Sequence, residues 1–211
     1  MLISIYLILK SLQIYNYYFL NFEFAKKNNS DALEQQKVVI TGGPGTGKST
    51  VIEKLTQLEF TCMPEISRII TKGAQETGID QLFLKDPLLF SNLLLEGRID
   101  QYKKAEVTAE KIVFFDRGIP DIFGYLDYLN ADYPENFIDE SLNHRYDKVF
   151  MMPPWKGIYK TDNERYESYE QSLTIYEHLI LAYKKIDYSV VVVPEGSIAS
   201  RAEFILNSLK P

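Results

Sequence analysis

Residues 42–49 have the composition and spacing of a loop that binds phosphate. They read Gly-Gly-Pro-Gly-Thr-Gly-Lys-Ser, which fits the P-loop pattern G-x-x-x-x-G-K-[ST]. In a P-loop, backbone N–H groups turn inward around phosphate oxygens, and the next helix adds the positive end of its dipole. Lys48 would reach the β- and γ-phosphates, and Ser49 would bind Mg²⁺. The predicted ligands of the loop are a nucleotide and Mg²⁺, and the predicted nucleotide-binding residues are Gly43, Pro44, Gly45, Thr46, Gly47, Lys48, Ser49 and Thr50.

A carboxylate and an arginine follow the second predicted strand, within the stretch Pro64-Glu65-Ile66-Ser67-Arg68. There Glu65 could approach Mg²⁺ or accept a proton from an acceptor hydroxyl. Arg68 lies one helical turn further on and could face the same cleft. The alternative is that Glu65 caps a helix N-terminus, where acidic residues are common.

The third predicted strand ends in Asp116-Arg117, and Asp121 follows shortly after. Four apolar residues before an Asp form a Walker-B pattern, in which Asp116 would hold Mg²⁺ directly or through water. Many buried strands end in Asp, so the P-loop upstream is what strengthens this interpretation. Arg117 offers a rigid, bidentate donor for phosphate. Asp121 is a candidate for substrate contact, although it could simply cap the following helix.

Residues 153–165 form a polar segment that is rich in basic and aromatic side chains. An enzyme that transfers phosphate needs a cover that excludes water, because ATP is otherwise hydrolysed. We expect this segment to be such a lid, with Arg165 as the residue that neutralises the transferring charge. The alternative is a solvated loop with ordinary surface cations.

The elements that must position these residues alternate between strand and helix. Apolar runs predict strands at 37–41, 60–63, 111–115, 148–152 and 188–193, and helical patterns predict helices at 49–58, 65–75, 86–104, 168–185 and 197–209. This alternation indicates an α/β fold with three layers, in which helices cover both faces of a five-stranded, mainly parallel sheet. Ligands then bind at the carboxyl ends of the strands. The predicted apolar stripes are Val51, Ile52, Leu55 and Leu58 in one helix, and Tyr169, Leu173, Tyr176, Ile180 and Tyr183 in another.

The composition is that of an ordinary globular α/β domain. The 211 residues are 45% hydrophobic and 25% charged, with a net charge of -6. This charge argues against non-specific nucleic-acid binding, which needs a basic face. The single cysteine, Cys62, excludes an internal disulfide and a cysteine-based zinc site within the chain, which fits a reducing cytoplasm.

The first residues of the chain differ from the rest. Residues 1–24 are rich in Ile, Leu, Tyr and Phe, but they lack the basic start and cleavage site of a signal peptide, and polar residues interrupt them. We expect residues 1–35 to be an extension outside the fold and residues 36–211 to be the P-loop domain. A membrane-surface helix at 1–24 is the alternative.

Taken together, the motifs resemble an AAA-like P-loop ATPase/kinase family. This family includes the ribosylnicotinamide kinase domain of a bacterial NAD-biosynthesis regulator and an animal photoreceptor-channel trafficking protein. The resemblance covers residues 37–209. It rests on Gly42 to Ser49, Pro64-Glu65 with Arg68, Asp116-Arg117-Gly118 with Pro120-Asp121, Trp155 with Asp162 and Glu164-Arg165, and Val193-Pro194 with Arg201.

The resemblance implies a nucleoside- or nucleotide-kinase-like core that binds ATP and Mg²⁺. Glu65 would be the base, Lys48 and Arg165 would stabilise charge, and Ser49 with Asp116 would hold the metal, which Glu65 could also approach. Arg117 and Arg68 would position phosphate or the acceptor. Side chains that could line the acceptor pocket are Phe90, Arg98, Tyr102, Tyr125 and Tyr128, although aromatic residues at helical spacing more often belong to a core.

Two other functions remain open at the level of sequence. A nucleotide-dependent switch or lipid-linked binding module would have no small-molecule acceptor. A Ras-like GTPase is disfavoured, because Lys184-Lys185-Ile186-Asp187 lacks the Asn of the guanine-binding motif Asn-Lys-x-Asp. An AAA+ motor subunit is disfavoured as well, since the chain is too short for the usual helical second domain.

Overall fold

The computed structural model of the protein describes residues 35–159 and 167–210. These residues group into two compact units, one made of 65–109 and the other of 35–64 with 110–210. The larger unit contains the sheet. The predicted extension, including the apolar residues 1–24, lies outside the described residues.

The sheet of the larger unit consists of five parallel strands in the order β2-β3-β1-β4-β5. The central strand β1 is buried on both of its faces, and Val38, Val39 and Ile40 are fully buried. Continuous apolar runs of this kind are typical of parallel strands that are covered on both sides. The strand bounds are Gln36–Thr41 (β1), Thr61–Met63 (β2), Ile112–Asp116 (β3), Lys148–Met151 (β4) and Val190–Val192 (β5).

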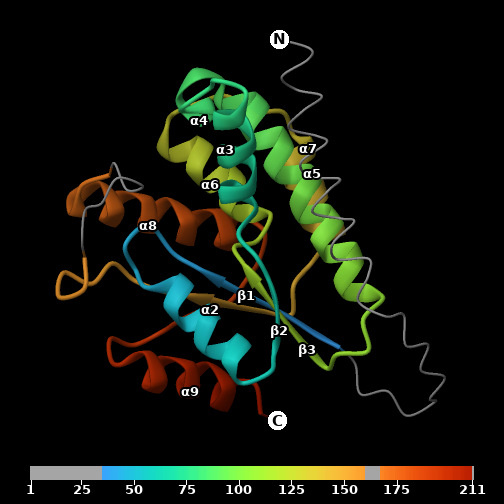
Figure 1. Ribbon diagram of the computed structural model, residues 1–211, viewed down its shortest axis with the longest axis vertical. Helices are drawn as coiled ribbons and strands as arrows, with labels where there is room; N and C mark the ends of the chain where they lie inside the picture. The colour runs from blue at the N-terminus through green and yellow to red at the C-terminus, as the bar shows by residue number, and fades with distance from the viewer. Residues whose placement is uncertain (1–34, 160–166, 211) are drawn as a thin grey trace. The chain divides into compact units, whose positions relative to one another are not determined.

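Helices cover both faces of this sheet, as Figure 1 shows. Helices α2 (Lys48–Gln57) and α9 (Ile198–Ser208) lie on one face, and α6 (Pro120–Tyr128) and α8 (Tyr169–Lys185) lie on the other. Helix α7 (Asn136–Asn143) contacts α6. The α2–α9 side contains a core cluster of Val38, Ile40, Val51, Leu55, Phe114, Phe150, Met152, Val193, Ala202, Ile205 and Leu209. The predicted three-layer α/β fold is therefore confirmed.

The smaller unit is helical, with α3 (Ile66–Glu76), α4 (Leu82–Lys85) and α5 (Pro87–Glu106). Asp86 caps α5, since its carboxylate accepts a hydrogen bond of 3.0 Å from the backbone N–H of Leu89. Pro87 occupies the first turn, where its missing N–H costs nothing. A Cβ at Gly97 of α5 would lie 2.7 Å from the Ile66 side chain of α3, so these two helices pack closely.

The stripe that we predicted for α8 is correct only at Tyr183, while Tyr169, Tyr176 and Ile180 are half-buried. The buried residues of this helix are Ser172, Ile175, Leu179, Ala182 and Tyr183, whereas Leu173 is 40% exposed. The buried row of Ser172, Ile175, Leu179 and Ala182 lies about one position before the predicted row. The buried row includes the small residues Ser172 and Ala182, which allow closer packing than the tyrosines of the predicted row. A Cβ at Gly124 of α6 would lie 3.0 Å from the Cβ of Ala182, so only small residues allow α6 and α8 to approach.

The stripe predicted for α2 is correct except at its end. Val51 and Leu55 are buried and Ile52 is half-buried, but Leu58 is 44% exposed. The reason is that the helix ends at Gln57 and Leu58 is its C-cap. The five strands and five helices that were predicted with bounds are all present, with ends within two residues. Helices α4 and α7 were not predicted, and α6 was predicted only as the helix that follows Asp121, without bounds.

Across residues 35–159 and 167–210, no helix combines the length and the apolar character that crossing a bilayer requires.

Candidate functional site

The P-loop connects the end of β1 at Thr41 to the start of α2 at Lys48. The ammonium group of Lys48 folds back over this loop and donates to the carbonyl oxygen of Gly43 at 2.7 Å and to Thr46 Oγ1 at 3.4 Å. The hydroxyl of Thr46 also donates to the Gly43 carbonyl oxygen, at 3.0 Å. The lysine is only 7% exposed. Its charge is therefore held inside the loop, where a phosphate group would need it.

Two glycines of the loop meet neighbouring elements at close range. A Cβ at Gly42, which has a φ of 146°, would lie 2.3 Å from the carbonyl oxygen of Met152. Gly47 is the N-cap of α2 and is left-handed, with a φ of 80°. A Cβ at Gly47 would lie 2.9 Å from guanidinium nitrogens of Arg201. Only glycine fits such positions without strain.

Asp116 at the end of β3 lies beside the start of the P-loop. It pairs in register with Ile40 of β1, and the backbone N–H of the next residue, Arg117, donates to the carbonyl oxygen of Ile40 at 3.1 Å. Ser49 lies in the first turn of α2. One carboxylate and one hydroxyl fit Mg²⁺, which is usually held by one or two protein oxygens together with phosphates and water.

Arg117 has an unusual backbone conformation for a residue other than glycine, with a φ of 73°. Its side chain turns back to the P-loop, where Nη1 donates to the carbonyl oxygen of Gly42 at 2.9 Å. The same nitrogen lies 3.4 Å from Asp121 Oδ1. The guanidinium carbon is 5.9 Å from the ring centre of Tyr125 on α6. The predicted residues Arg117, Asp121 and Tyr125 therefore lie together next to the P-loop.

The carboxylate of Asp121 is buried, at 1% exposure, among protein donors. Oδ1 accepts from the hydroxyl of Thr41 and lies near Arg117 Nη1. Oδ2 accepts from the backbone N–H of Gly118 at 2.9 Å and from the hydroxyl of Tyr183 at 2.6 Å. Four donors match the acceptor capacity of a carboxylate. This arrangement argues against the predicted direct contact of Asp121 with substrate. Asp121 is not the helix cap either, because α6 begins at Pro120 with Ile119 as its N-cap.

The loop after β4 lies against the P-loop. A Cβ at Gly45 would lie 2.6 Å from ring carbons of Tyr159. Tyr159 in turn stacks edge-on against Tyr169 at 5.5 Å between ring centres and donates from its hydroxyl to the carbonyl oxygen of Glu167. Arg165, the predicted lid residue, lies outside the described residues.

Arg201 of α9 was not predicted as a site residue, although it was one of the positions of the family resemblance. It is 5% exposed, and Nη1 donates to the carbonyl oxygen of Thr46 at 3.0 Å. Within the described part of the chain, its Nε atom is buried and has no hydrogen-bond partner. Burial lowers the pKa of the Arg201 guanidinium. Arg201 lies 155 positions after Thr46 in the chain, which explains why no local sequence pattern gave it a role.

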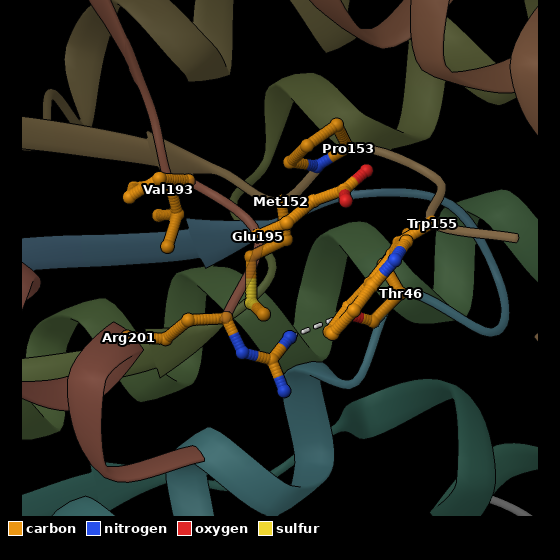
Figure 2. Close-up of a pocket in the computed structure, with 8 residues that line it drawn as sticks. Thr46, Met152, Pro153, Trp155, Val193, Glu195 and Arg201 are labelled. Carbon is orange, nitrogen blue, oxygen red and sulfur yellow. Dashed lines mark hydrogen bonds between the residues drawn. The ribbon is translucent and has the colours of Figure 1, made fainter. Parts of the chain in front are cut away.

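Arg201 borders a small pocket beside the P-loop. In Figure 2, Arg201 comes from α9 and Trp155 from the loop after β4, and the dashed line joins Arg201 to Thr46. The cavity volume is about 10 Å³, which is too small for a nucleotide base. The lining residues are Thr46, Met152, Pro153, Trp155, Val193, Pro194, Glu195 and Arg201.

Glu65, Arg68 and Arg98 belong to the smaller unit, so their predicted roles at the P-loop stay predictions. Glu65 is at the N-cap position of α3, but its side chain makes no capping hydrogen bond. Instead Glu65 Oε2 accepts from Arg68 Nε at 2.9 Å. Arg98 is 3% exposed on α5. Phe90 and Tyr102 also lie on α5, whereas Tyr128 follows Tyr125 on α6 in the larger unit.

A known protein family matches most of the chain. A family model described as an AAA domain matches residues 37–201. The chain belongs to this AAA domain family. Among curated proteins, no sequence matches the chain.

Solved structures with the same fold include a nucleoside kinase, a nucleotide kinase and NadR. Deoxyadenosine kinase from M. mycoides, with the products dCMP and dCDP, is 21% identical to this AAA domain protein, with a TM-score of 0.61 over 82% of this chain and 98% of that one. NadR protein in complex with NR is 18% identical, with a TM-score of 0.65 over 83% of this chain and 50% of that one. Thymidylate kinase from Ehrlichia chaffeensis is 16% identical, with a TM-score of 0.56 over 84% and 100%. At these identities the similarity establishes the fold.

Proposed function

We propose that this AAA domain protein is a small-molecule kinase that transfers the γ-phosphoryl group of ATP to a hydroxyl of a nucleoside-like acceptor. The observation that carries the proposal is that the P-loop, with Lys48 at its end, follows β1, and that Asp116-Arg117 stands at the end of the neighbouring strand β3. There Arg117 donates to the Gly42 carbonyl oxygen of the P-loop. The fold shared with nucleoside and nucleotide kinases supports it. The NadR structure contains NR, which makes a ribosylnicotinamide-like molecule our first candidate acceptor.

The ATP phosphates would lie in the P-loop, where Lys48 is already buried among loop oxygens. Moving this ammonium from the Gly43 carbonyl oxygen to phosphate oxygens exchanges a neutral acceptor for a charged one, which strengthens the hydrogen bond. Ser49 and Asp116 would hold Mg²⁺, which would supply positive charge opposite the phosphates. Glu65 could also approach this ion, as the sequence predicts.

The base of ATP would enter the pocket between Trp155 and Arg201. This pocket borders Thr46 of the P-loop, so a base there would be continuous with phosphates in the loop. Because the open volume is too small for a base, Trp155 or Arg201 must shift when the nucleotide binds. The buried Nε of Arg201 would gain an acceptor in that step.

In the transfer step, an acceptor hydroxyl oxygen forms a bond to the γ-phosphorus, and the bond from this phosphorus to the β,γ-bridging oxygen breaks. ADP leaves with the electron pair of that bond. Glu65 takes the hydroxyl proton. Lys48, Arg117 and Arg165 stabilise the charge on the transferring group. Arg68, Arg98 and Tyr125 orient the acceptor.

The test is an ADP-release assay with ATP, Mg²⁺ and a panel of nucleosides, nucleotides and sugars. The proposal predicts that at least one acceptor raises ADP release well above the rate without acceptor, and that Lys48→Ala abolishes this increase. If no acceptor raises ADP release above the basal rate, the protein acts as a nucleotide-dependent switch or ATPase, and the kinase proposal is wrong.

A further inference from the structure

We propose that Asp121 is a positioning residue that acts through Arg117, and that Tyr183 of α8 holds Asp121 in place. This inference rests on the proposed function, in which Arg117 contacts the transferring phosphate. The observation behind it is a buried network that joins the P-loop, the β3–α6 turn and α8 through a single carboxylate.

The orientation of the Arg117 side chain depends on the groups that contact it. Its left-handed backbone, with a φ of 73°, is unfavourable for a residue with a side chain. The backbone N–H is fixed by the Ile40 carbonyl oxygen at 3.1 Å. At the far end, Nη1 meets two acceptors, the Gly42 carbonyl oxygen at 2.9 Å and Asp121 Oδ1 at 3.4 Å. Two acceptors at one nitrogen fix the plane of a guanidinium group, and that plane decides how a bidentate group meets phosphate.

Asp121 is fixed more tightly than Arg117. Besides the arginine, its oxygens accept from Thr41 at the end of β1, from the backbone N–H of Gly118, and from Tyr183 on α8. These donors come from three separate segments, so the carboxylate cannot turn without breaking several hydrogen bonds. The side chain is 1% exposed, and Arg117 supplies the positive charge that a buried carboxylate needs.

Tyr183 is the contribution of α8 to this network. Its side chain is fully buried, and its hydroxyl donates to Asp121 Oδ2 at 2.6 Å. A Cβ at Gly118 would lie only 2.6 Å from that hydroxyl oxygen, so the turn after β3 leaves space for this hydroxyl. The hydroxyl of Tyr183 therefore helps to orient Arg117 through Asp121. Helix α8 thus stabilises the site as well as the core.

The first experiment is a double-mutant cycle with Asp121→Asn and Arg117→Ala, read as kcat and KM for ATP turnover. Asp121→Asn keeps the shape of the side chain but replaces one acceptor oxygen by a donor. We expect it to lower kcat at least about tenfold, the factor that corresponds to one lost charge-assisted hydrogen bond. In the Arg117→Ala background the same substitution should change kcat less than about twofold. Equal factors in both backgrounds would overturn the proposal.

A second pair of variants separates positioning from stability. Tyr183→Phe removes the hydroxyl that faces Asp121, while Tyr188→Phe removes a buried hydroxyl that accepts from the Tyr146 backbone N–H at 2.8 Å. The two rings stack edge-on at 5.5 Å between centres. We expect both variants to lose thermal stability and only Tyr183→Phe to lose kcat. Equal losses of kcat would overturn the role of Tyr183.

Failure of the proposed function gives a different result from failure of this inference. If the wild-type protein transfers phosphate to no acceptor, the kinase proposal fails. In that case the double-mutant cycle is measured through the dissociation constant of Mg-ATP, determined by calorimetry, instead of through kcat. A loss of affinity with Asp121→Asn that requires Arg117 supports positioning, and a loss that is the same without Arg117 contradicts it.

Discussion

At the scale of single residues, Lys48 and Glu65 are expected to act in different steps. Lys48 lies in the P-loop, where its ammonium group donates to the Gly43 carbonyl oxygen at 2.7 Å, so we propose that it acts on bound phosphates. Glu65 acts on the acceptor in our proposal. Lys48→Ala should therefore weaken ATP binding, whereas Glu65→Gln should keep ATP binding and lose turnover by about 10²- to 10⁴-fold, as expected when a general base is removed. Calorimetry and ADP release measure the two effects. Full turnover by Glu65→Gln would show that another group is the base.

Cys62 provides a prediction about pH at the same scale. Burial is the main reason that the pKa of its thiol lies above the ordinary value, and the negative charge of Asp116 raises it further. A raised pKa means less thiolate at neutral pH, and the thiolate is the reactive form. Alkylation of the native protein by iodoacetamide should therefore be slower than alkylation of the unfolded chain, and should accelerate with pH up to a higher pH than in the unfolded chain. Mass spectrometry measures both rates. Equal rates and equal pH profiles would contradict the assigned burial.

At the scale of elements, α8 shows where sequence patterns stop being sufficient. The P-loop could be predicted because its residues are contiguous and each has a known task. The buried face of α8 could not, because the choice between its two rows depends on Gly124 of α6, which lies far away in sequence. The pairing of Arg201 with Thr46 was out of reach for the same reason. Asp121 was identified as a site residue, but two of the four donors around it, Thr41 and Tyr183, come from distant segments that no local pattern connects to it.

The corrected face of α8 can be tested with two identical substitutions. Leu179→Ala removes a fully buried side chain and should lower the free energy of unfolding by about 2–5 kcal/mol. Leu173→Ala removes a side chain that is 40% exposed and should change it by less than about 0.5 kcal/mol. Urea denaturation measures both. The reverse order would restore the stripe that sequence periodicity predicted.

At the scale of the whole molecule, the order β2-β3-β1-β4-β5 places the P-loop strand β1 between β3 and β4. The ends of these neighbours bring Asp116 and the Met152 carbonyl oxygen to the loop from either side. Helix α9 adds Arg201 from the last part of the chain. Nucleotide binding should therefore stabilise the larger unit as a whole, because its site is built from segments spread over most of that unit.

Because nucleotide binding should stabilise the folded protein, we predict that its thermal stability rises when Mg-ATP is added. Mg-ATP at 100 times its dissociation constant should add about 2.7 kcal/mol to the free energy of unfolding. Trp155, the single tryptophan of the chain, lines the small pocket, so its fluorescence should change in the same titration. Lys48→Ala should reduce both effects. If Mg-ATP stabilises the protein without changing the Trp155 fluorescence, the adenine base of ATP binds outside this pocket.

The most direct test of the central claim follows the γ-phosphate itself. The full chain is incubated with γ-labelled ATP, Mg²⁺ and the acceptor that most stimulates ADP release, and the products are separated. We predict that the label appears in the acceptor with the wild-type protein and is absent from it with Lys48→Ala. Label that appears only in inorganic phosphate, at the same rate with and without acceptor, would contradict the assignment as a kinase.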